Sequence, residues 1–172
     1  MKAACIGPLL VAALLLPGAA HAFPDATPWD EDCRTCHQQT EERPASNLVL
    51  DGLPATAQPG ARYPLAIRLK DAAMKRAGFR LLAEGCNGSG GLFAGTDEKL
   101  ESEGAKLRTT YDGTTLAPGT TLMEWNVVWQ APKAGGCTLT FRLHANAGNN
   151  DLSPLGDVIY VVERQVPVIG AE

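Results

Sequence analysis

The chain has 172 residues, and 19 aspartate and glutamate residues outnumber 15 lysine and arginine residues, which gives a net charge of −4 with neutral histidine. This mild acidic excess argues against nucleic acid or an anionic membrane surface as a partner, and it suits a partner protein with a positive patch. The sequence contains five cysteines and three histidines, and the spacing of these residues is the main guide to function.

The first 22 residues have the pattern of a cleaved export signal. Lys2 precedes a short apolar run at residues 8–16, and Ala-His-Ala at residues 20–22 matches the small-x-small cleavage rule. The apolar run is too short to anchor the chain in a bilayer. We therefore expect cleavage after Ala22, loss of Cys5 with the signal peptide, and a mature protein without a membrane span in a bacterial periplasm.

Residues 33–37 read Cys-Arg-Thr-Cys-His, which is the attachment pattern for a c-type haem. Two thiols one helical turn apart, on Cys33 and Cys36, can add to the two vinyl groups of one porphyrin edge. The adjacent imidazole of His37 is then carried under the ring as the proximal iron ligand. We therefore expect one covalently attached haem c, held by these three residues.

Other uses of the motif fit the sequence less well. A structural zinc site needs four ligands, and no second Cys/His pair with suitable spacing follows. A thioredoxin-type redox pair would lie near a βαβ pattern, which the downstream sequence lacks. A structural disulfide between neighbours as close as Cys33 and Cys36 would be strained. A metal site or a chance match remains the alternative to haem.

The haem motif lies in a short segment, residues 23–46, in front of the main domain. Acidic residues at 30–32 mark a possible helix start, and Pro44 ends the helical potential, so one or two turns are expected. Such a segment is much shorter than an ordinary globular cytochrome c, and its haem should be partly exposed. Phe23 and Trp29 flank the motif and would either cover the haem edge or anchor the segment.

From residue 47 the sequence changes to short β patterns separated by glycine, proline and asparagine. The expected strands lie at residues 48–50, 63–69, 79–83, 91–95, 122–129, 138–143 and 158–162. This number of strands without a long helix predicts an all-β, immunoglobulin-like sandwich over residues 47–164. Residues 71–77 are expected to connect two strands, and residues 165–172 to form a C-terminal tail.

Cys86 ends one expected strand region, and Cys137 opens another 51 residues later. In an exported protein we expect these two cysteines to form a disulfide. Closing a loop of this length typically contributes about 2–4 kcal/mol to stability. Two separate buried thiols are the alternative.

Five stretches of the β-rich region stand out as a set. They are Ala77-Gly78-Phe79-Arg80-Leu81, residues 92–96, residues 125–132, and residues 141–151 with 156–160. Together they resemble the reelin-type (reeler) domain family and its bacterial relatives. The resemblance covers about residues 48–163 and implies an immunoglobulin-like sandwich, with the haem motif as an N-terminal extension. Where many relatives carry a histidine before the tryptophan-rich strand, this chain has Arg108-Thr109-Thr110-Tyr111.

The sixth ligand of the haem iron decides between electron transfer and binding of a small molecule. After cleavage of the signal peptide, the candidates are His144, Met74 and Met123. Met123 shares a strand face with two tryptophans, so we expect it in the core. His144 faces outward if Leu143 faces inward, and it could meet a ring lying across the sheet. We rank His144 first, Met74 in its polar connection second, and an open or water-filled site third.

A polar turn precedes the last expected strand. Its side chains belong to Asn146, Asn149, Asn150, Asp151 and Asp157. Residues of this type cap turns locally, and two carboxylates are too few for a typical calcium site. We therefore expect these residues to stabilise the turn.

The sequence predicts a periplasmic mono-haem c-type cytochrome that passes single electrons between redox partner proteins. An enzyme is not expected, because no catalytic triad, phosphate loop or carboxylate pair stands out in the sequence. One alternative is a five-coordinate haem that binds or senses a small gas or peroxide. Another is an adhesion or assembly sandwich with an accessory haem. The short haem segment also leaves room for a homo-oligomer or larger complex in which a second chain supplies the sixth ligand.

Overall fold

The computed structural model describes residues 29, 33–37, 42–44, 46–95, 97–151, 153 and 155–170. The expected signal peptide, its cleavage site and Phe23 lie outside these residues. No helix in the described part of the chain is long and apolar enough to cross a membrane.

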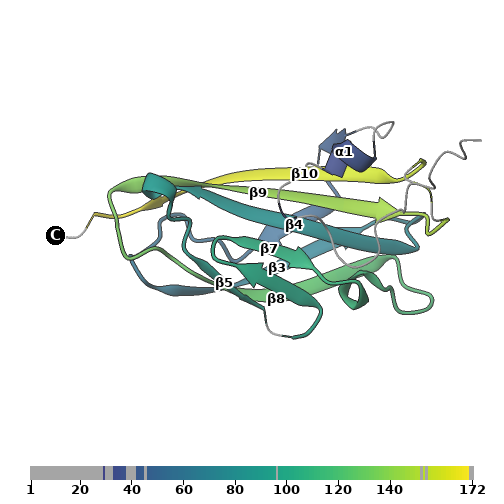
Figure 1. The fold of residues 1–172 in the computed structure, drawn as a ribbon, viewed down its shortest axis with the longest axis horizontal. Coiled ribbons are helices and arrows are strands. Elements are labelled where there is room, and N and C mark those ends of the chain that lie inside the picture. The colour runs from purple at the N-terminus through teal and green to yellow at the C-terminus, as the bar shows by residue number, and fades with distance from the viewer. Residues whose placement is uncertain are drawn as a thin grey trace, which may run out of the picture.

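Two β-sheets form the body of the molecule (Figure 1). The strands are β1 (Glu42–Pro44), β2 (Leu48–Asp51), β3 (Arg62–Lys70), β4 (Arg76–Gly85), β5 (Leu92–Gly95), β6 (Leu100–Glu103), β7 (Lys106–Thr109), β8 (Leu122–Gln130), β9 (Cys137–Gly148) and β10 (Val158–Val168). One sheet has the order β1-β10-β9-β4-β7-β6, and the other has the order β2-β3-β8-β5. All pairs of these strands are antiparallel except β1 with β10. The predicted all-β, immunoglobulin-like sandwich is confirmed.

The core lies between the two sheets, where alternate side chains of each strand point inward. Phe141 and Leu143 on β9 and Trp129 on β8 are fully buried. The rings of Trp129 and Phe141 meet edge to face, with their centroids 4.9 Å apart, and such a pair stabilises the core beyond the burial of its area. Met123 is 9% exposed and belongs to the same core, as its alternation with the tryptophans predicted.

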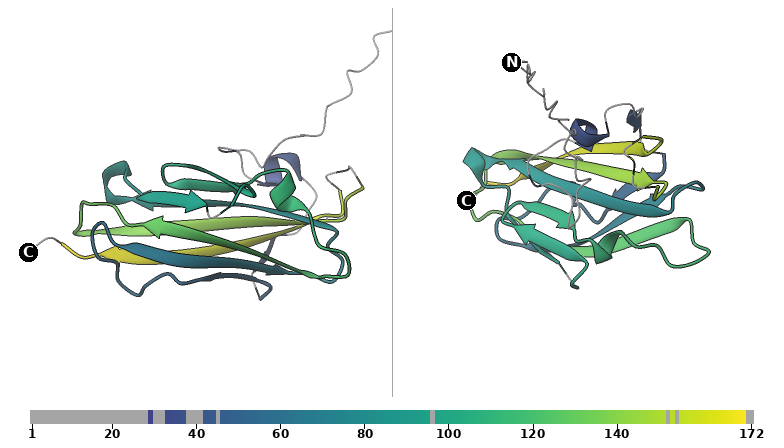
Figure 2. Two further views of the ribbon diagram at one scale, coloured as in Figure 1. Left: turned by 90° about the horizontal axis from the view of Figure 1, so that it is seen from below. Right: turned by 45° about the vertical axis from the view of Figure 1, so that its right-hand side comes forward.

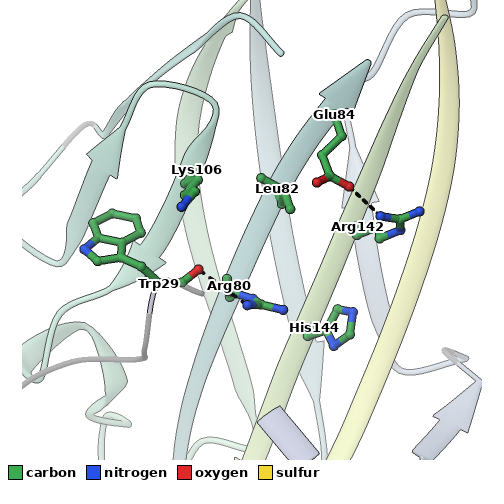
Figure 3. A pocket seen from close by; sticks show the side chains of 7 residues that line it. All are labelled: Trp29, Arg80, Leu82, Glu84, Lys106, Arg142 and His144. Atoms are coloured by element: carbon green, nitrogen blue, oxygen red, sulfur yellow. Dashed lines mark hydrogen bonds and ion pairs between the residues drawn. The ribbon is translucent and has the colours of Figure 1, made fainter. Parts of the chain in front are cut away.

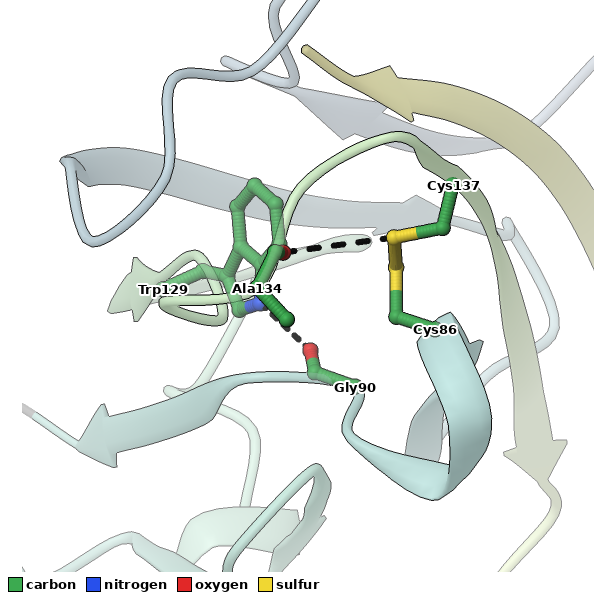
Figure 4. The surroundings of a disulfide bond; sticks show 5 residues. All are labelled: Cys86, Gly90, Trp129, Ala134 and Cys137. Carbon is green, nitrogen blue, oxygen red and sulfur yellow. Dashed lines mark hydrogen bonds between the residues drawn. A yellow bond between two sulfur atoms is a disulfide. The ribbon is translucent and has the colours of Figure 1, made fainter. Parts of the chain in front are cut away.

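The predicted disulfide between Cys86 and Cys137 is also confirmed. It joins the end of β4 to the start of β9, and the two Cα atoms lie 5.2 Å apart, a usual separation for such a bond. Figure 4 shows the disulfide near the indole of Trp129, whose Nε1–H donates to the carbonyl oxygen of Gly90 at 3.0 Å. The bridge therefore ties together two loops at one end of the sandwich.

The structure extends the predicted sandwich in two places. Strand β10 continues to Val168, past the boundary predicted at residue 164, because Val166 and Val168 are each 2% exposed and belong to the core. The hairpin of β6 and β7 was not among the expected strands. Its sequence is mostly polar, and the buried side chains of Leu100 and Leu107 hold it to the core.

Thr109 on β7 is a buried polar residue whose hydroxyl has a defined role. Its Oγ1 accepts a hydrogen bond of 3.2 Å from the buried backbone N–H of Phe79. Thr109→Val keeps the shape of the side chain but leaves this N–H without its acceptor, so the free energy of unfolding should fall by about 1–3 kcal/mol. Urea unfolding measures the change. As a control, Thr138→Val at an exposed position on β9 should stay within about 0.5 kcal/mol of wild type. Equal losses in both variants would contradict this role.

Candidate functional site

The segment that carries the Cys-x-x-Cys-His motif lies on the outer face of the six-stranded sheet (Figures 1 and 2). Its helix α1 (Cys33–Cys36) contacts β9, and β1 pairs in parallel with β10 through Glu42 opposite Ile159 and Pro44 opposite Val161. Ile159 is fully buried but is not part of the core between the sheets. The outer face of the sheet is therefore covered where this segment lies.

Trp29 anchors the same segment farther across the sheet. The guanidinium carbon of Arg108 lies 4.1 Å from the centroid of the Trp29 ring, a geometry that gives a cation–π attraction. Arg108 is held in place by Glu101, whose Oε2 accepts from its Nη2 at 2.7 Å. The backbone oxygen of Trp29 accepts from Nη1 of Arg80 at 3.4 Å. These contacts anchor Trp29 on the sandwich, which is one of the two roles expected for it.

Helix α1 is a single turn, and it ends where His37 begins. The backbone N–H of His37 donates to the carbonyl oxygen of Cys33 at 3.1 Å, which continues the helical hydrogen-bond pattern by one residue. The side chain of Cys33 is partly buried, and that of His37 is 22% exposed. The predicted helical turn over the motif is present, and it directs His37 toward the sheet.

The imidazole of His37 lies between two residues of the sandwich. Its Nδ1 is 3.0 Å from Oδ2 of Asp157, a carboxylate that is 6% exposed. Its Nε2 is 3.3 Å from Nδ2 of Asn146 on β9. The amide nitrogen of Asn146 also donates to Asp157 at 3.0 Å, which fixes the orientation of the amide. Nε2 therefore faces a donor, and the network assigns the proton of the neutral imidazole to Nδ1.

Asp157 is ionised in this arrangement. Burial alone would raise its pKa, but hydrogen bonds from His37, Asn146 and the backbone N–H of Asn149, together with the charge interaction with His37, lower the pKa below its ordinary value. A carboxylate that accepts a hydrogen bond from Nδ1–H increases the basicity of Nε2. Asp157 also caps the Asn149 backbone, so it fulfils the turn-capping role predicted for it and a second role that was not predicted.

The tautomer of His37 fits an iron-binding histidine, but its Nε2 accepts a hydrogen bond from Asn146 in this structure and would have to exchange that contact for iron. Iron-binding histidines use one ring nitrogen and donate the other N–H to a carboxylate or a carbonyl oxygen, and His37 has this arrangement with Nε2 as the acceptor nitrogen. Within the described part of the chain, Oδ1 of Asn146 is buried and has no hydrogen-bond partner. Buried polar atoms normally have a hydrogen-bond partner, so the side-chain oxygen of Asn146, beside Nε2 of His37, is an exception.

A groove of about 430 Å³ lies beside this site on the same outer face (Figure 3). It is lined by outward side chains of β4, β7 and β9 and by the anchored tryptophan, namely Trp29, Arg80, Leu82, Glu84, Lys106, Arg142 and His144. His144 faces outward while Leu143 is fully buried, as the alternation predicted. The highest-ranked candidate for the sixth ligand therefore lies on the face that carries α1.

Met74 was the second-ranked candidate for the sixth iron ligand, and its position in the structure shows that this prediction was wrong. Met74 is 3% exposed and packs in the core between the sheets, so its sulfur does not reach the outer face. The backbone N–H of Lys75 donates to the carbonyl oxygen of Gly148 at 2.8 Å, which closes the connection over the core. The polar neighbours of Met74 in the sequence predicted exposure, but this closure buries the residue.

Sequence reasoning missed the pairing of His37 with Asp157. The two residues are 120 positions apart, and no local pattern connects them. A partial signal was available, because Asn146 and His144 alternate onto the same face of β9 and Asp157 immediately precedes β10. This pattern predicts a polar end of the sheet, but it does not predict that His37 binds there.

Neither a protein-family model nor a curated protein matches the sequence. Among solved structures, the fold is similar to the reelin-N domain of F-spondin, with 19% sequence identity and a TM-score of 0.49 over 81% of this chain and 97% of that chain. A human F-spondin reeler domain gives 20% identity and a TM-score of 0.47 over 76% and 95% of the two chains. The sulfur carrier protein SoxY from Chlorobium limicola f thiosulfatophilum has 10% sequence identity and a TM-score of 0.43, over 78% of this chain and 90% of that chain. Similarities at this level concern the fold alone.

Proposed function

We propose that the protein is an exported c-type cytochrome with one haem, which passes single electrons between partner proteins. The observation that carries this proposal is the environment of His37. The residue ends a Cys-x-x-Cys-His motif, its Nδ1 contacts the buried carboxylate of Asp157, and its Nε2 is the acceptor nitrogen. The contact of Nδ1 with a carboxylate is the support that an iron-binding imidazole typically has.

The haem would be held by thioether bonds to Cys33 and Cys36 and by Nε2 of His37. In forming each thioether, a cysteine thiol adds across one vinyl group, so that a sulfur–carbon bond forms and the thiol proton goes to the other vinyl carbon. When bound, the haem supplies a one-electron couple between ferrous and ferric iron. Asp157 keeps the imidazole in the required tautomer, and the contact between Trp29 and Arg108 holds the segment on the sheet.

Four further observations support export and electron exchange with proteins. The disulfide between Cys86 and Cys137 suits an oxidising compartment, as does the export signal in the sequence. The haem segment is short and lies on the outside of the sandwich, so a bound haem would have an edge near the surface for a partner. The net charge of −4 favours partners with a positive docking patch.

The direct test is covalent haem attachment. The full chain is produced with a periplasmic haem-attachment machinery, and haem is detected on a denaturing gel and by its visible spectrum. We expect covalent haem in wild type and in Thr35→Ala, a control in the same helical turn, and its loss in a variant with both Cys33→Ser and Cys36→Ser. A folded wild-type protein without covalent haem would refute the proposal.

A further inference from the structure

We propose that the groove on the outer face of the six-stranded sheet binds a small organic dicarboxylate, held between Arg80 and Lys106. Such a site goes beyond the proposed function, since it requires neither haem nor the histidine of the attachment motif. Three features of the groove support it: the partners of its arginines, the charge of its lining, and the spacing of its two cations.

The groove contains two arginines whose charges are compensated differently. Arg142 contacts the carboxylates of Glu84 and Glu163, so its charge is satisfied within the protein. The guanidinium of Arg80 donates to the backbone oxygen of Trp29 at 3.4 Å, and it has no carboxylate partner in the described part of the chain. A partly buried guanidinium of this kind retains donors for a carboxylate from outside, which arginine binds through two parallel, charge-assisted hydrogen bonds.

The remaining charge of the lining is positive. Glu84 is the carboxylate of the lining and is paired with Arg142, which leaves Arg80 and Lys106 as the other charged side chains. His144 adds a positive charge only when it is protonated. This excess is local, because the net charge of the chain is −4. Two positive charges match the two negative charges of a dicarboxylate.

The strand register sets the spacing of the two cations. Lys106 on β7 lies opposite Leu82 on β4, and Arg80 lies two residues before Leu82 on the same face. Diagonal neighbours of this kind are about 7–8 Å apart, and both side chains are long enough to converge on groups that are closer together. Figure 3 shows Leu82 between Lys106 and Arg142, with Trp29 on the same side as Lys106. The apolar parts of Leu82 and Trp29 are therefore available to the carbon chain that joins two carboxylates.

The size of the groove suits a small ligand. Its volume of about 430 Å³ lies toward the lower end of the range of about 300–1,000 Å³ that is usual for small-molecule sites. The segment anchored by Trp29 bounds the groove on one side. A mostly charged lining of this size favours a compact, doubly charged acid over a large apolar molecule.

The first experiment measures succinate binding to the protein purified from the periplasm, by isothermal titration calorimetry. Butyrate is the matched ligand, since it has the same chain length and one carboxylate, and it should bind about tenfold more weakly than succinate. Arg80→Gln should weaken succinate binding about tenfold, because hydrogen bonds between charged groups are lost. Arg164→Gln removes the same charge from an exposed position outside the groove and should bind succinate as wild type does.

The second experiment tests the position of the second carboxylate. Lys106→Gln should weaken succinate binding and leave butyrate binding unchanged, because only the dicarboxylate loses a cation. Glu103 is exposed, lies opposite Lys106 in the β6–β7 hairpin, and does not line the groove. Glu103→Gln should strengthen succinate binding, because it removes a competing negative charge. Circular dichroism and thermal unfolding establish that each variant is folded.

The outcomes separate this inference from the proposed function. Absence of saturable succinate binding by wild type, or equal binding by wild type and Arg80→Gln, would overturn the inference and leave the cytochrome proposal standing. Equal affinities for succinate and butyrate would overturn the dicarboxylate as the ligand class. Tighter binding of a short peptide with two glutamates would assign the groove to an acidic segment of a partner protein instead. Absence of covalent haem would refute the proposed function and leave these expected affinities unchanged.

Discussion

Asp157→Asn is expected to raise the reduction potential of the proposed haem. The carboxylate lies 3.0 Å from Nδ1 of His37. It makes Nε2 donate its electron pair to iron more strongly, and this stabilises ferric iron more than ferrous iron. Removing a partner of this kind typically weakens a metal site 10–100-fold. If that loss falls on the ferric state, the potential rises by on the order of 60–120 mV, since a tenfold change is about 59 mV for one electron. A redox titration followed by visible absorption measures this potential.

Asp151→Asn is the control for this experiment. Asp151 lies in the same turn and contacts Asn149 rather than His37. Removing the charge of its carboxylate should therefore leave the reduction potential unchanged. Asp157 also accepts from the backbone N–H of Asn149, and loss of this structural contact alone would lower the unfolding temperature without moving the potential. A haem-loaded Asp157→Asn variant with the wild-type potential would therefore show that the carboxylate does not act through the iron ligand.

Removal of the disulfide is expected to cause a large loss of stability. In a variant with both Cys86→Ser and Cys137→Ser, the unfolded chain regains the freedom of a loop spanning 51 residues, which corresponds to about 4 kcal/mol. For a domain of this size the unfolding temperature should fall by about 8–16 °C. Thermal unfolding can be followed by tryptophan fluorescence, to which the fully buried Trp129 next to the bridged loops contributes.

Reduction of the wild-type protein provides an independent comparison for the disulfide. Wild type in the presence of a thiol reductant should unfold at the same temperature as the double variant without reductant. The double variant should be insensitive to the reductant. An unfolding temperature for the double variant equal to that of oxidised wild type would contradict the stabilising role of the bridge.

The fold was predictable because its main strands alternate cleanly. On β8 and β9 the inward positions hold large apolar residues such as Trp129 and Phe141. A slip of one residue would turn these rings to the outer face, so their burial fixes the register of each strand. The same alternation predicted that His144 faces outward. The hairpin of β6 and β7 was missed because its short strands are mostly polar, so local sequence gives little indication of burial.

The site was predictable in its motif but not in its supporting residues. Cys33, Cys36 and His37 are recognisable because their spacing is local. Asp157 reaches His37 through the packing of the N-terminal segment on β9 and β10, and that contact depends on tertiary structure alone. Asp157 was missed, whereas Met74 was wrongly included. Its polar neighbours in the sequence suggested an exposed residue, but the fold buries it.

The parallel pairing of β1 with β10 has a consequence for the edge of the six-stranded sheet. In the described part of the chain, the outer edge of β10 is paired with β1 at Ile159–Val161 and with Ala57 at Val168. An uncovered strand edge offers free backbone groups to a second chain and promotes aggregation. The segment that carries the Cys-x-x-Cys-His motif thus also shields a sheet edge, and a chain whose segment fails to dock would be prone to edge-to-edge aggregation.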